Sequence, residues 1–375
     1  MTDAIDSLVE ISHHYGANPE YVIAGGGNTS LKTQDKLWIK ASGIYLADIG
    51  PDGFVMLSRN RLREMESRIY SKDPLKREEE VKNDLKAATI APEGLRPSVE
   101  TSLHNLIEYA FVVHTHMTLA NALMCSNHAE QEVRERFGSE ALYVEYTDPG
   151  YTLFKKLQDR IGTYHDSWGK DPKIIFLQNH GVFVGADTTE EIKAIYDSIE
   201  FRIRKGKNLD LPDHRCTEYS SGTSEAVAGF FDSMELETGS YASDLISHFS
   251  SGIAAFSKIS RPFTPDIIVY CKSNYLFLEA GMEKQQIPGA IEQFKAGHGY
   301  FPKVIMEEKG GLIISEENQR CISTVLEVFT DMMKISYLSD QFGGPHFMTE
   351  EQIMTIDKWE VENYRRSVAR SRDRA

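Results

Sequence analysis

Several features that define large classes of proteins are missing from this 375-residue sequence. No apolar run approaches the roughly 20 residues that a membrane-spanning helix needs. Residues 1–16 contain acids but no basic stretch, so we expect no secretory signal at this end. Basic residues are outnumbered, 41 against 56 acidic ones, and the formal net charge is −15. We therefore expect neither a membrane partner nor a nucleic-acid partner, since nucleic acids bind basic faces.

Cysteine is scarce, and none of the four cysteines forms a C-x-x-C pair. Cysteine ligation of a metal is therefore not expected. Isolated thiols that stay reduced and mostly buried are typical of a cytoplasmic protein. The hydrophobic content of 41% and the charged content of 26% are those of an ordinary globular chain, which argues against disorder.

Segments typical of strands alternate with segments typical of helices throughout the chain, which predicts an α/β fold. In the first part we expect helices over 4–16 and 57–90, a third capped by Ser98, and a fourth beginning at Thr188 or Thr189. Strands are expected there over 37–43, 110–116 and 173–185, the last bent near Asn179–Gly181.

A polar segment at residues 207–225 marks the expected boundary between two domains. We predict a first domain over 1–215, a smaller second α/β domain over 216–345, and a charged C-terminal helix or tail over 346–375. In the second domain, strands are expected over 266–271, 275–279, 303–308 and 311–315, followed by a long helix over 317–338.

Two segments of the chain are similar to one another. PKIIFLQNHGVFVG begins at Pro172, and PKVIMEEKGGLIIS begins 130 residues later at Pro302. This alignment sets His180 opposite Gly310. We infer that the second domain contains a strand–turn–strand–helix unit like that of the first, without its histidine; a chance likeness of two hairpins is the alternative.

Two histidines, His114 and His116, lie two residues apart in the apolar segment 110–116. In a strand, period-two alternation turns both imidazoles to the same face. A shared divalent metal, zinc above all, explains such a pair, because neutral imidazole is a common zinc ligand. Two structural histidines with satisfied hydrogen bonds are the alternative.

His180 and Glu100 complete the candidate metal site. His180 lies in an Asn-His-Gly bend, where Gly181 permits an unusual backbone conformation; the alternative is a turn histidine bonded to backbone. Glu100, on the expected helix after Pro97, is either a solvated first-turn acid or, near a metal, a fourth ligand or general base. Three histidines and a displaceable carboxylate leave the open position that catalytic zinc requires.

A glycine-rich turn, GGGNTS at residues 25–30, could form a nest of backbone N–H groups for an anion, with Asn28 and Ser30 adding side-chain donors. Ser42 and Gly43 offer a second turn, and Ser98 lies near a helix N-terminus, which also favours anions. Positive charge could come from Lys32, Lys40 and Arg96. The turn matches neither a phosphate-binding P-loop nor a dinucleotide fingerprint.

Together these residues resemble the class II aldolase/adducin family. The matching motifs follow the family's order within residues 5–205: Gly26–Ser30, Ser42-Gly43, Arg96–Thr101, His114–His116, Tyr146–Gly150 and Asn179–Gly181. Beyond residue 220 the chain resembles the aldolase part of bifunctional rhamnulose-1-phosphate aldolase/alcohol dehydrogenases. No dinucleotide motif occurs, so the resemblance does not extend to dehydrogenase activity.

The resemblance implies a three-layer αβα fold for the first domain and a zinc-dependent enzyme, with another divalent metal as the alternative. The implied metal ligands are His114, His116 and His180, with Glu100 as the adjacent catalytic acid/base. The implied phosphate-binding residues are Gly27, Asn28, Ser42, Gly43 and Ser98. Gly25 and Val99 depart from the hydroxyl residues of the family's sugar-phosphate aldolases, and Lys32 or Lys40 is a candidate compensating cation.

The implied reaction is cleavage of a ketose 1-phosphate, of the rhamnulose or fuculose type, to dihydroxyacetone phosphate and a hydroxyaldehyde such as L-lactaldehyde. Tyr146 and Tyr151 are candidate acids for the aldehyde oxygen, with a packing role as the alternative. The competing functions are a metal-dependent sugar-phosphate epimerase or decarboxylase of the same family and a non-catalytic adducin-like binding protein. A homo-oligomer, preferably a tetramer, that acts on a small-molecule sugar phosphate is expected.

Overall fold

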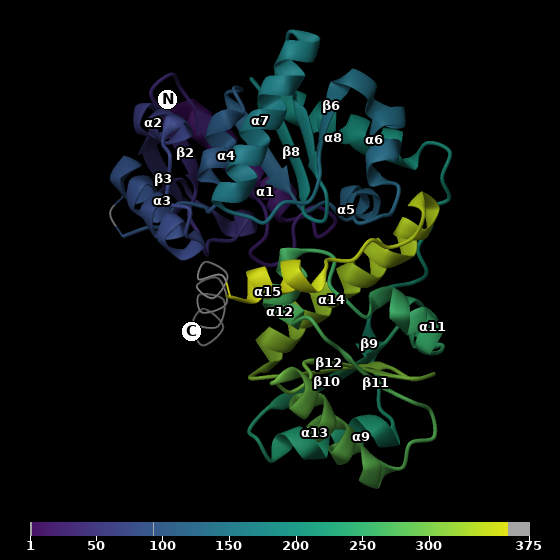
Figure 1. The fold of residues 1–375 in the computed structure, drawn as a ribbon. Coiled ribbons are helices and arrows are strands. Elements are labelled where there is room, and N and C mark those ends of the chain that lie inside the picture. Colours follow the sequence, from purple (N-terminus) through teal and green to yellow (C-terminus); the bar gives the residue numbers. More distant parts are fainter. Residues whose placement is uncertain (1, 93, 359–375) are drawn as a thin grey trace. The chain divides into compact units, whose positions relative to one another are not determined.

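The computed structural model describes residues 2–92 and 94–358, which fall into two compact units (Figure 1). The first unit comprises residues up to 124 together with 128–207, and the second comprises 125–127 and the described residues from 208 onward. Both units combine a sheet with helices, which confirms the α/β fold class. Within the described part of the chain, no helix has the length and hydropathy needed to span a bilayer.

The first unit is built on an eight-stranded sheet in the order β4–β3–β2–β1–β5–β8–β7–β6. Its strands are β1 (Asn28–Lys32), β2 (Lys36–Lys40), β3 (Phe54–Ser58), β4 (Thr89–Ala91), β5 (Phe111–Thr115), β6 (Ala141–Val144), β7 (Ile174–Leu177) and β8 (Gly181–Ala186). Only β6 and β7 are parallel, and every other neighbouring pair in this sheet is antiparallel.

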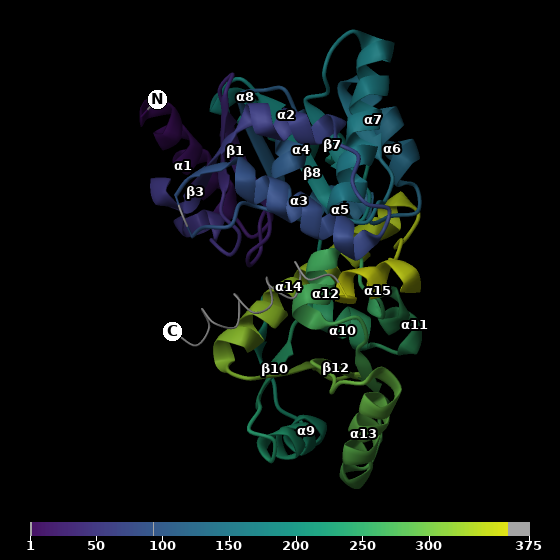
Figure 2. The same ribbon diagram turned by 60° about the vertical axis from the view of Figure 1, so that its left-hand side comes forward.

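Helices cover both faces of this sheet, which confirms the three-layer arrangement. The helices are α1 (Thr2–Gly16), α2 (Arg59–Ser67), α3 (Pro74–Ala88), α4 (Thr101–Leu106), α5 (Thr118–Met124), α6 (Ala129–Phe137), α7 (Tyr151–Trp168) and α8 (Thr189–Arg204). α4 and α7 pack on one face over β5, β7 and β8, and α2 and α3 continue this layer over β2 and β3 (Figure 2). α1, α5, α6 and α8 cover the other face.

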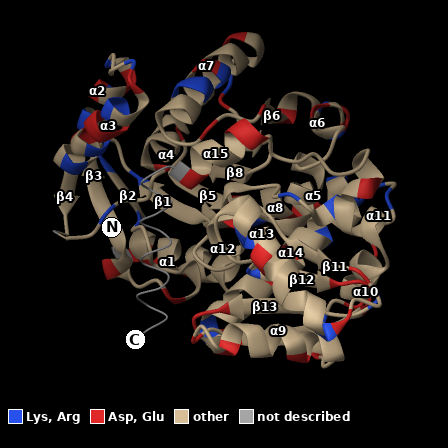
Figure 3. Cartoon of the chain, turned by 60° about the horizontal axis from the view of Figure 1, so that its bottom comes forward, with Lys and Arg blue, Asp and Glu red and all other residues tan. Residues whose placement is uncertain are grey.

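Lys, Arg, Asp and Glu residues are found on the outer helices, α3 and α7 among them, whereas β5 and β8 contain none (Figure 3). Strands covered on both faces are expected to be apolar along their whole length. A polar side chain on such a strand, such as His114 on β5, therefore needs a specific partner.

Two expected helix starts can be compared with the structure. α8 begins as predicted, with Thr188 as its N-cap accepting a hydrogen bond from the Glu191 N–H at 3.2 Å. The predicted capping role of Ser98 is wrong, because Ser98 lies in a turn and α4 begins only at Thr101. The carbonyl of Ser98 accepts the Thr101 hydroxyl at 2.6 Å, which stabilises this turn instead of a longer helix.

The second unit has a five-stranded sheet in the order β11–β12–β13–β10–β9. Its strands are β9 (Thr217–Glu218), β10 (Glu237–Ala242), β11 (Leu276–Leu278), β12 (Val304–Glu307) and β13 (Leu312–Glu316). Its helices are α9 (Gly222–Asp232), α10 (Asp244–Ser250), α11 (Ile253–Phe256), α12 (Pro265–Cys271), α13 (Ile287–His298), α14 (Gln319–Ser339) and α15 (Glu350–Lys358). α9 and α13 pack on one face of the sheet, and α14 contacts β10 and β13.

The strand expected over 266–271 is wrong, since these residues form α12. Pro265 occupies the first turn of the helix, and six of the seven helical residues are buried. A short helix that is apolar all round has no polar face, so its sequence has the pattern of a buried strand. The strands expected near 275–279, 303–308 and 311–315 and the long helix after them are present as β11, β12, β13 and α14. Of the predicted C-terminal helix or tail, α15 is described, and residues 359–375 lie outside the described part.

Candidate metal centre

The sheet of the first unit brings four strand ends to one edge. β5 is antiparallel to both of its neighbours, with His114 opposite Asn28 of β1 and Thr115 opposite Val182 of β8. The end of β5 therefore lies beside the starts of β1 and β8. β7 ends at the same edge, where Leu177 pairs with Gly181 across a tight hairpin. This topology brings the predicted histidines together.

The three predicted histidines form one cluster. One ring nitrogen from each of His114, His116 and His180 lies within 4.8 Å of the other two, and the Nε2 atoms of His114 and His116 are 3.1 Å apart. His114 is fully buried, and its ring stacks on Phe183 at a centroid distance of 4.0 Å. Its Nδ1–H donates to the Val182 carbonyl at 3.0 Å, which leaves the lone pair of Nε2 facing the cluster. Burial lowers the pKa of His114, so the ring is neutral, as a metal ligand must be.

The Asn-His-Gly bend is explained by close packing at its glycine. A Cβ atom on Gly181 would lie 2.5 Å from the Thr115 carbonyl oxygen and 3.0 Å from ring atoms of both His114 and His116. The left-handed backbone of the bend is found at Asn179, with φ of 54°, and not at Gly181 as the sequence suggested. Asparagine tolerates this conformation better than most residues, so the bend needs both residue types.

Glu100 faces the histidines from the N-terminal end of α4, where it occupies the N-cap position. Its Oε1 lies 3.2 Å from Nε2 of His180 and 3.6 Å from Nε2 of His114. Its Oε2 accepts a hydrogen bond from the Asn28 amide at 2.5 Å. Burial would raise the pKa of Glu100, whereas the hydrogen bond from the Asn28 amide lowers it.

This donor set fits a divalent cation. Oε1 of Glu100 is buried and makes no hydrogen bond, although buried carboxylate oxygens are normally satisfied. Three imidazole nitrogens and this oxygen are the ligand types of catalytic zinc sites. A metal would satisfy Oε1 of Glu100 and the lone pair that His114 directs at the cluster.

The predicted phosphate-binding residues lie at the same edge of the sheet. Asn28 begins β1, and Ser42 and Gly43 follow β2, which is antiparallel to β1. The segment before α4 runs beside β2: the Ser98 N–H donates to the Lys40 carbonyl at 3.1 Å, and the Ser42 N–H donates to the Arg96 carbonyl at 2.8 Å. Gly27 has φ of 64°, and a Cβ there would lie 2.9 Å from the His114 carbonyl oxygen, so this glycine is also required by packing. A phosphate-binding role for these residues stays a prediction.

Two of the remaining candidates have other roles in the structure. Lys32 as a compensating phosphate cation is wrong, because its ammonium group is buried and donates to the His104 carbonyl at 2.7 Å. Tyr151 packs in an aromatic cluster with Tyr70 and Phe154, which favours the packing alternative. Tyr146 follows β6, and its N–H donates to the Gln178 side chain beside the bend at 3.3 Å. Burial, with Asp148 adding to the effect, raises the pKa of Tyr146.

Behind Glu100 lies a buried polar group whose hydrogen-bond partners the sequence analysis did not predict. His104 is fully buried, contacts Ser30 and Asn28 with its two ring nitrogens, and accepts from Lys32 with its carbonyl. The signal was present in the sequence, because Asn28, Ser30 and Lys32 place a polar residue at every second position of one strand. Such a row on a covered face of a sheet calls for buried partners.

Comparison with known proteins agrees with this arrangement. A sequence model of the class II aldolase and adducin N-terminal domain matches residues 6–204, which take in every residue of the cluster. The chain belongs to this family. The resemblance inferred from the sequence motifs is thereby confirmed for the first unit.

Several individual relatives are also similar. The uncharacterized oxidoreductase YuxG of Bacillus subtilis (strain 168) is 25% identical over 323 residues, and the match takes in 79% of this chain but only 45% of that protein. The chain thus spans less than half the length of this curated relative. The N-terminal class II aldolase domain of a conserved Thermoplasma acidophilum protein is 27% identical, with a TM-score of 0.46, over 53% of this chain and 91% of that domain. An L-fuculose-1-phosphate aldolase from Thermus thermophilus is 16% identical, with a TM-score of 0.36, over 54% of this chain and 93% of the aldolase.

Proposed function

We propose that the chain is a zinc-dependent aldolase that cleaves a ketose 1-phosphate to dihydroxyacetone phosphate and a hydroxyaldehyde. The observation that supports this most is the buried carboxylate oxygen of Glu100, which has no hydrogen bond and faces His114 and His180. A carboxylate held beside a cluster of imidazoles can exchange a proton with substrate next to a bound metal. Membership in the class II aldolase and adducin family supports the same reading.

The ligands of the metal would be His114, His116 and His180, with Glu100 displaced when substrate binds. When bound, the cation supplies Lewis-acid polarisation of the substrate's carbonyl oxygen and offsets the negative charge of an enediolate. Imidazole-rich sets of this kind suit zinc, although other divalent metals also bind imidazole.

The protein's own groups account for the proton at the new C–H bond. Cleavage transfers the proton of the C4 hydroxyl to Oε1 of Glu100, breaks the C3–C4 bond with its electron pair moving to C3, and leaves an aldehyde and an enediolate. We assign Oε1 of Glu100 to deliver a proton to C3, which gives dihydroxyacetone phosphate. The hydrogen bond from Asn28 fixes Oε2, so that Oε1 is the oxygen that faces the cluster.

The substrate phosphate would bind in the turns that contain Gly27, Ser42 and Gly43, with Asn28 and Ser98 as side-chain donors. These turns lie at the same sheet edge as the histidines, because β1 and β2 are antiparallel neighbours. Backbone N–H groups in glycine-rich turns bind anions without a basic side chain. A net charge of −15 is therefore compatible with a phosphorylated substrate.

The proposal is tested with the zinc-loaded full chain, rhamnulose 1-phosphate and fuculose 1-phosphate, and a coupled assay for dihydroxyacetone phosphate. We expect release of this product by the wild type, and at least 10²-fold less by Glu100→Gln with its zinc content unchanged, because general acid–base catalysis contributes roughly 10²–10⁴-fold. Turnover without dihydroxyacetone phosphate would instead indicate an epimerase or decarboxylase. Full activity after thorough metal stripping would refute the metal mechanism, and the absence of stoichiometric metal would favour an adducin-like binding protein.

A further inference from the structure

One face of β1 presents a row of three buried polar side chains to α4. Asn28, Ser30 and Lys32 alternate along the strand and therefore point to the same side. All three are at most 6% exposed. All three contact one residue of the helix, His104, which is itself fully buried.

The hydrogen bonds to His104 determine the orientation of the Asn28 amide. The ring Nε2 contacts Oδ1 of Asn28, which can only accept, so Nε2 carries the proton. The ring Nδ1 then accepts from the Ser30 hydroxyl at 2.7 Å. With its oxygen occupied by His104, the Asn28 amide turns its NH₂ group to Oε2 of Glu100. Burial, with Lys32 as the next cause, lowers the pKa of His104 to about 3, in accord with a neutral ring.

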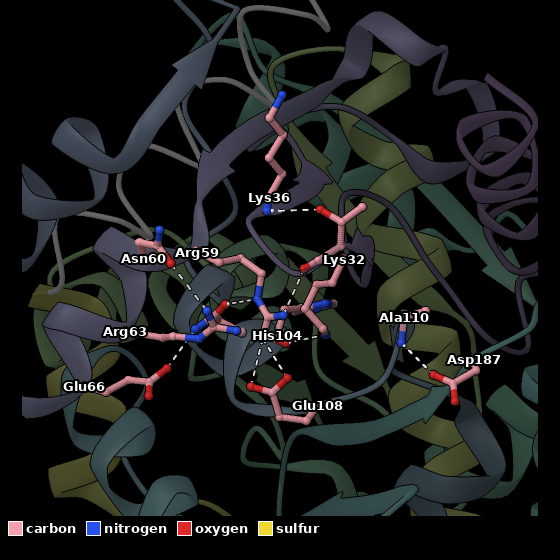
Figure 4. Close-up of polar contacts among 12 residues, drawn as sticks. Lys32, Lys36, Arg59, Asn60, Arg63, Glu66, His104, Glu108, Ala110 and Asp187 are labelled. Atoms are coloured by element: carbon pink, nitrogen blue, oxygen red, sulfur yellow. Dashed lines mark hydrogen bonds and ion pairs between the residues drawn. The ribbon is translucent and has the colours of Figure 1, made fainter. Parts of the chain in front are cut away.

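Two buried basic side chains hold the other end of α4 (Figure 4). The Lys32 ammonium donates to the His104 carbonyl at 2.7 Å, and Nε of Arg59 donates to the Asn105 side chain at 3.0 Å. Arg59 also forms a two-pronged ion pair with Glu108, both contacts at 2.8 Å. A six-residue helix is not stable by itself, and hydrogen-bond donors at its C-terminal end stabilise its unpaired carbonyls. The place of Glu100, at the N-cap, thus depends on contacts from β1 and Arg59.

We propose that His104 is a positioning residue for Glu100, which acts through Asn28. This inference rests on the proposed function, since it assigns His104 a part in the proton transfer by Glu100. His104 locks the Asn28 amide in the one orientation that offers a donor to Oε2 of Glu100 and leaves Oε1 for the cluster. If His104 only filled the core, it would not need to orient the Asn28 amide.

The test compares His104→Leu with His104→Gln in the zinc-loaded full chain. Glutamine can place its own Nε2 donor near the position of the ring Nε2, whereas leucine fills space without a donor. We expect His104→Leu to lower kcat roughly 10²-fold, because small displacements of a catalytic group have effects of this size. The KM of His104→Leu should stay within about threefold of the wild-type value, and its zinc content should be unchanged. The kcat of His104→Gln should be at least tenfold higher than that of His104→Leu.

Ser12→Ala is the matched control, because it removes a buried 2.6 Å hydrogen bond to Thr29 on the opposite face of β1. It should lower the melting temperature without lowering kcat. Equal kcat values for His104→Leu and Ser12→Ala would refute the positioning role, as would an imidazole ¹⁵N NMR spectrum showing His104 protonated on Nδ1. A wild type that releases no dihydroxyacetone phosphate would refute the proposed function instead, so the two failures are distinguishable.

A second inference rests on strand pairing in the second unit. The strand order β11–β12–β13–β10–β9 corresponds, one for one, to β6–β7–β8–β5–β1, and the first pair in each series is parallel while the others are antiparallel. The register agrees as well. Ile174 pairs with Val184, and 130 residues later Val304 pairs with Ile314.

Local details of the two hairpins also agree at this spacing. Left-handed backbone occurs at Asn179 and at Lys309, with φ of 54° and 57°. In each hairpin, a Cβ on one glycine would lie very close to a carbonyl oxygen of the neighbouring strand. The distance is 2.5 Å from Gly181 to the Thr115 oxygen and 2.6 Å from Gly311 to the Tyr241 oxygen. Each helix that follows has a polar N-cap side chain that accepts from a backbone N–H.

We infer that the second unit is a copy of the part of the first unit formed by β1 and β5–β8. In this copy the metal site has been lost. The strand register sets Ser240 at the place of His114, Ala242 at that of His116, and Gly310 at that of His180. The space beside the bend holds Glu307, whose Oε2 accepts from the Ser221 hydroxyl at 2.8 Å and the Tyr219 hydroxyl at 3.1 Å. The backbone frame of a three-histidine site remains, without its ligands.

The test counts bound zinc by elemental analysis after loading and desalting the full chain. The wild type should hold one zinc per chain. A variant combining Ser240→His, Ala242→His and Gly310→His with Glu307→Ala, which clears the space that a Cβ at position 310 would enter, should hold two. Adding His114→Ala should return the count to one. Two zinc ions in the wild type, or one in the folded fourfold variant, would refute the inference.

Discussion

The two units present different side chains on strands that are paired alike. In the first unit, imidazoles lie at the ends of β5 and β8, and a buried carboxylate faces them from α4. At the matching edge of the second unit, Glu307 satisfies its carboxylate with hydroxyl groups of Tyr219 and Ser221. Both units thus place a carboxylate at this edge, but among the carboxylates of the described residues only that of Glu100 has a buried oxygen that makes no hydrogen bond. The difference shows that strand pairing provides the frame of the candidate site, whereas the side chains at the strand ends distinguish the two units.

The largest expected difference between the units is at the positions of His114 and Ser240. We expect His114→Ala to abolish stoichiometric zinc and to lower aldolase activity at least about 10³-fold, because Lewis-acid polarisation contributes several kcal/mol. Ser240→Ala, at the matching position of β10, should change neither quantity. Both are measured by elemental analysis and by dihydroxyacetone phosphate release. Equal losses in the two variants would contradict the assignment of the metal to the first unit alone.

The next difference concerns two lysines 130 residues apart that lie before β7 and β12. Lys303 pairs with Glu316, whose side chain is 8% exposed, whereas Lys173 pairs with Glu191, whose side chain is 40% exposed. We expect Lys303→Met to lower the free energy of unfolding by about 3 kcal/mol, because it leaves a buried carboxylate unpaired. Lys173→Met should cost below about 1 kcal/mol, since exposed pairs contribute little. Urea unfolding of both variants measures the difference, and similar costs would contradict the contrast in burial.

The histidine cluster was largely predictable from the sequence. His114 and His116 lie two residues apart on an apolar strand, and the Asn-His-Gly bend supplied His180, so the strand period and the bend sufficed. Asn28 and Ser98 were predicted to be anion donors, which stays a prediction, and the part of Asn28 in holding Glu100 was not predicted. That role depends on α4 lying over β1, a tertiary contact that no local pattern of residues determines.

The fold of the second unit was harder to predict. The hairpin β12–β13 and α14 were expected, because they repeat the pattern of the first unit. β10, with a glycine and alternating small and polar residues in ETGSYA, has too weak an apolar pattern to indicate a strand by itself. α12 is buried on all sides and therefore lacks the polar face that marks a helix. Both errors arise where tertiary packing determines the secondary structure.

Replacing Gly181 or Gly311 by alanine should lower stability by similar amounts. The two replacements should differ in their effect on metal binding. A Cβ at Gly181 or at Gly311 would lie about as close to a carbonyl oxygen of the neighbouring strand, 2.5 Å and 2.6 Å. We expect each alanine variant to lower the free energy of unfolding by about 1–3 kcal/mol, the usual cost of overpacking. Only Gly181→Ala should also weaken zinc binding, because its Cβ would contact His114 and His116. Zinc titration and urea unfolding separate the two effects, and a large stability difference between the variants would count against equivalent hairpins.

The smallest expected effects on the free energy of unfolding concern Asn179 and Lys309, the two hairpin residues with left-handed backbone. Replacing each by glycine should have opposite effects on stability in the two units. Lys309 is exposed, so its side chain contributes little and its backbone strain is the main term. Lys309→Gly should therefore stabilise the chain by about 0.5 kcal/mol, which is the relief of left-handed strain less the entropy that glycine adds to the unfolded state. Asn179 is 1% exposed, and buried amide groups are hydrogen-bonded in nearly all native proteins, so Asn179→Gly should cost about 1 kcal/mol. Paired urea unfolding curves resolve effects of this size, and a destabilised Lys309→Gly would show that its side chain has a structural role that Asn179 does not share.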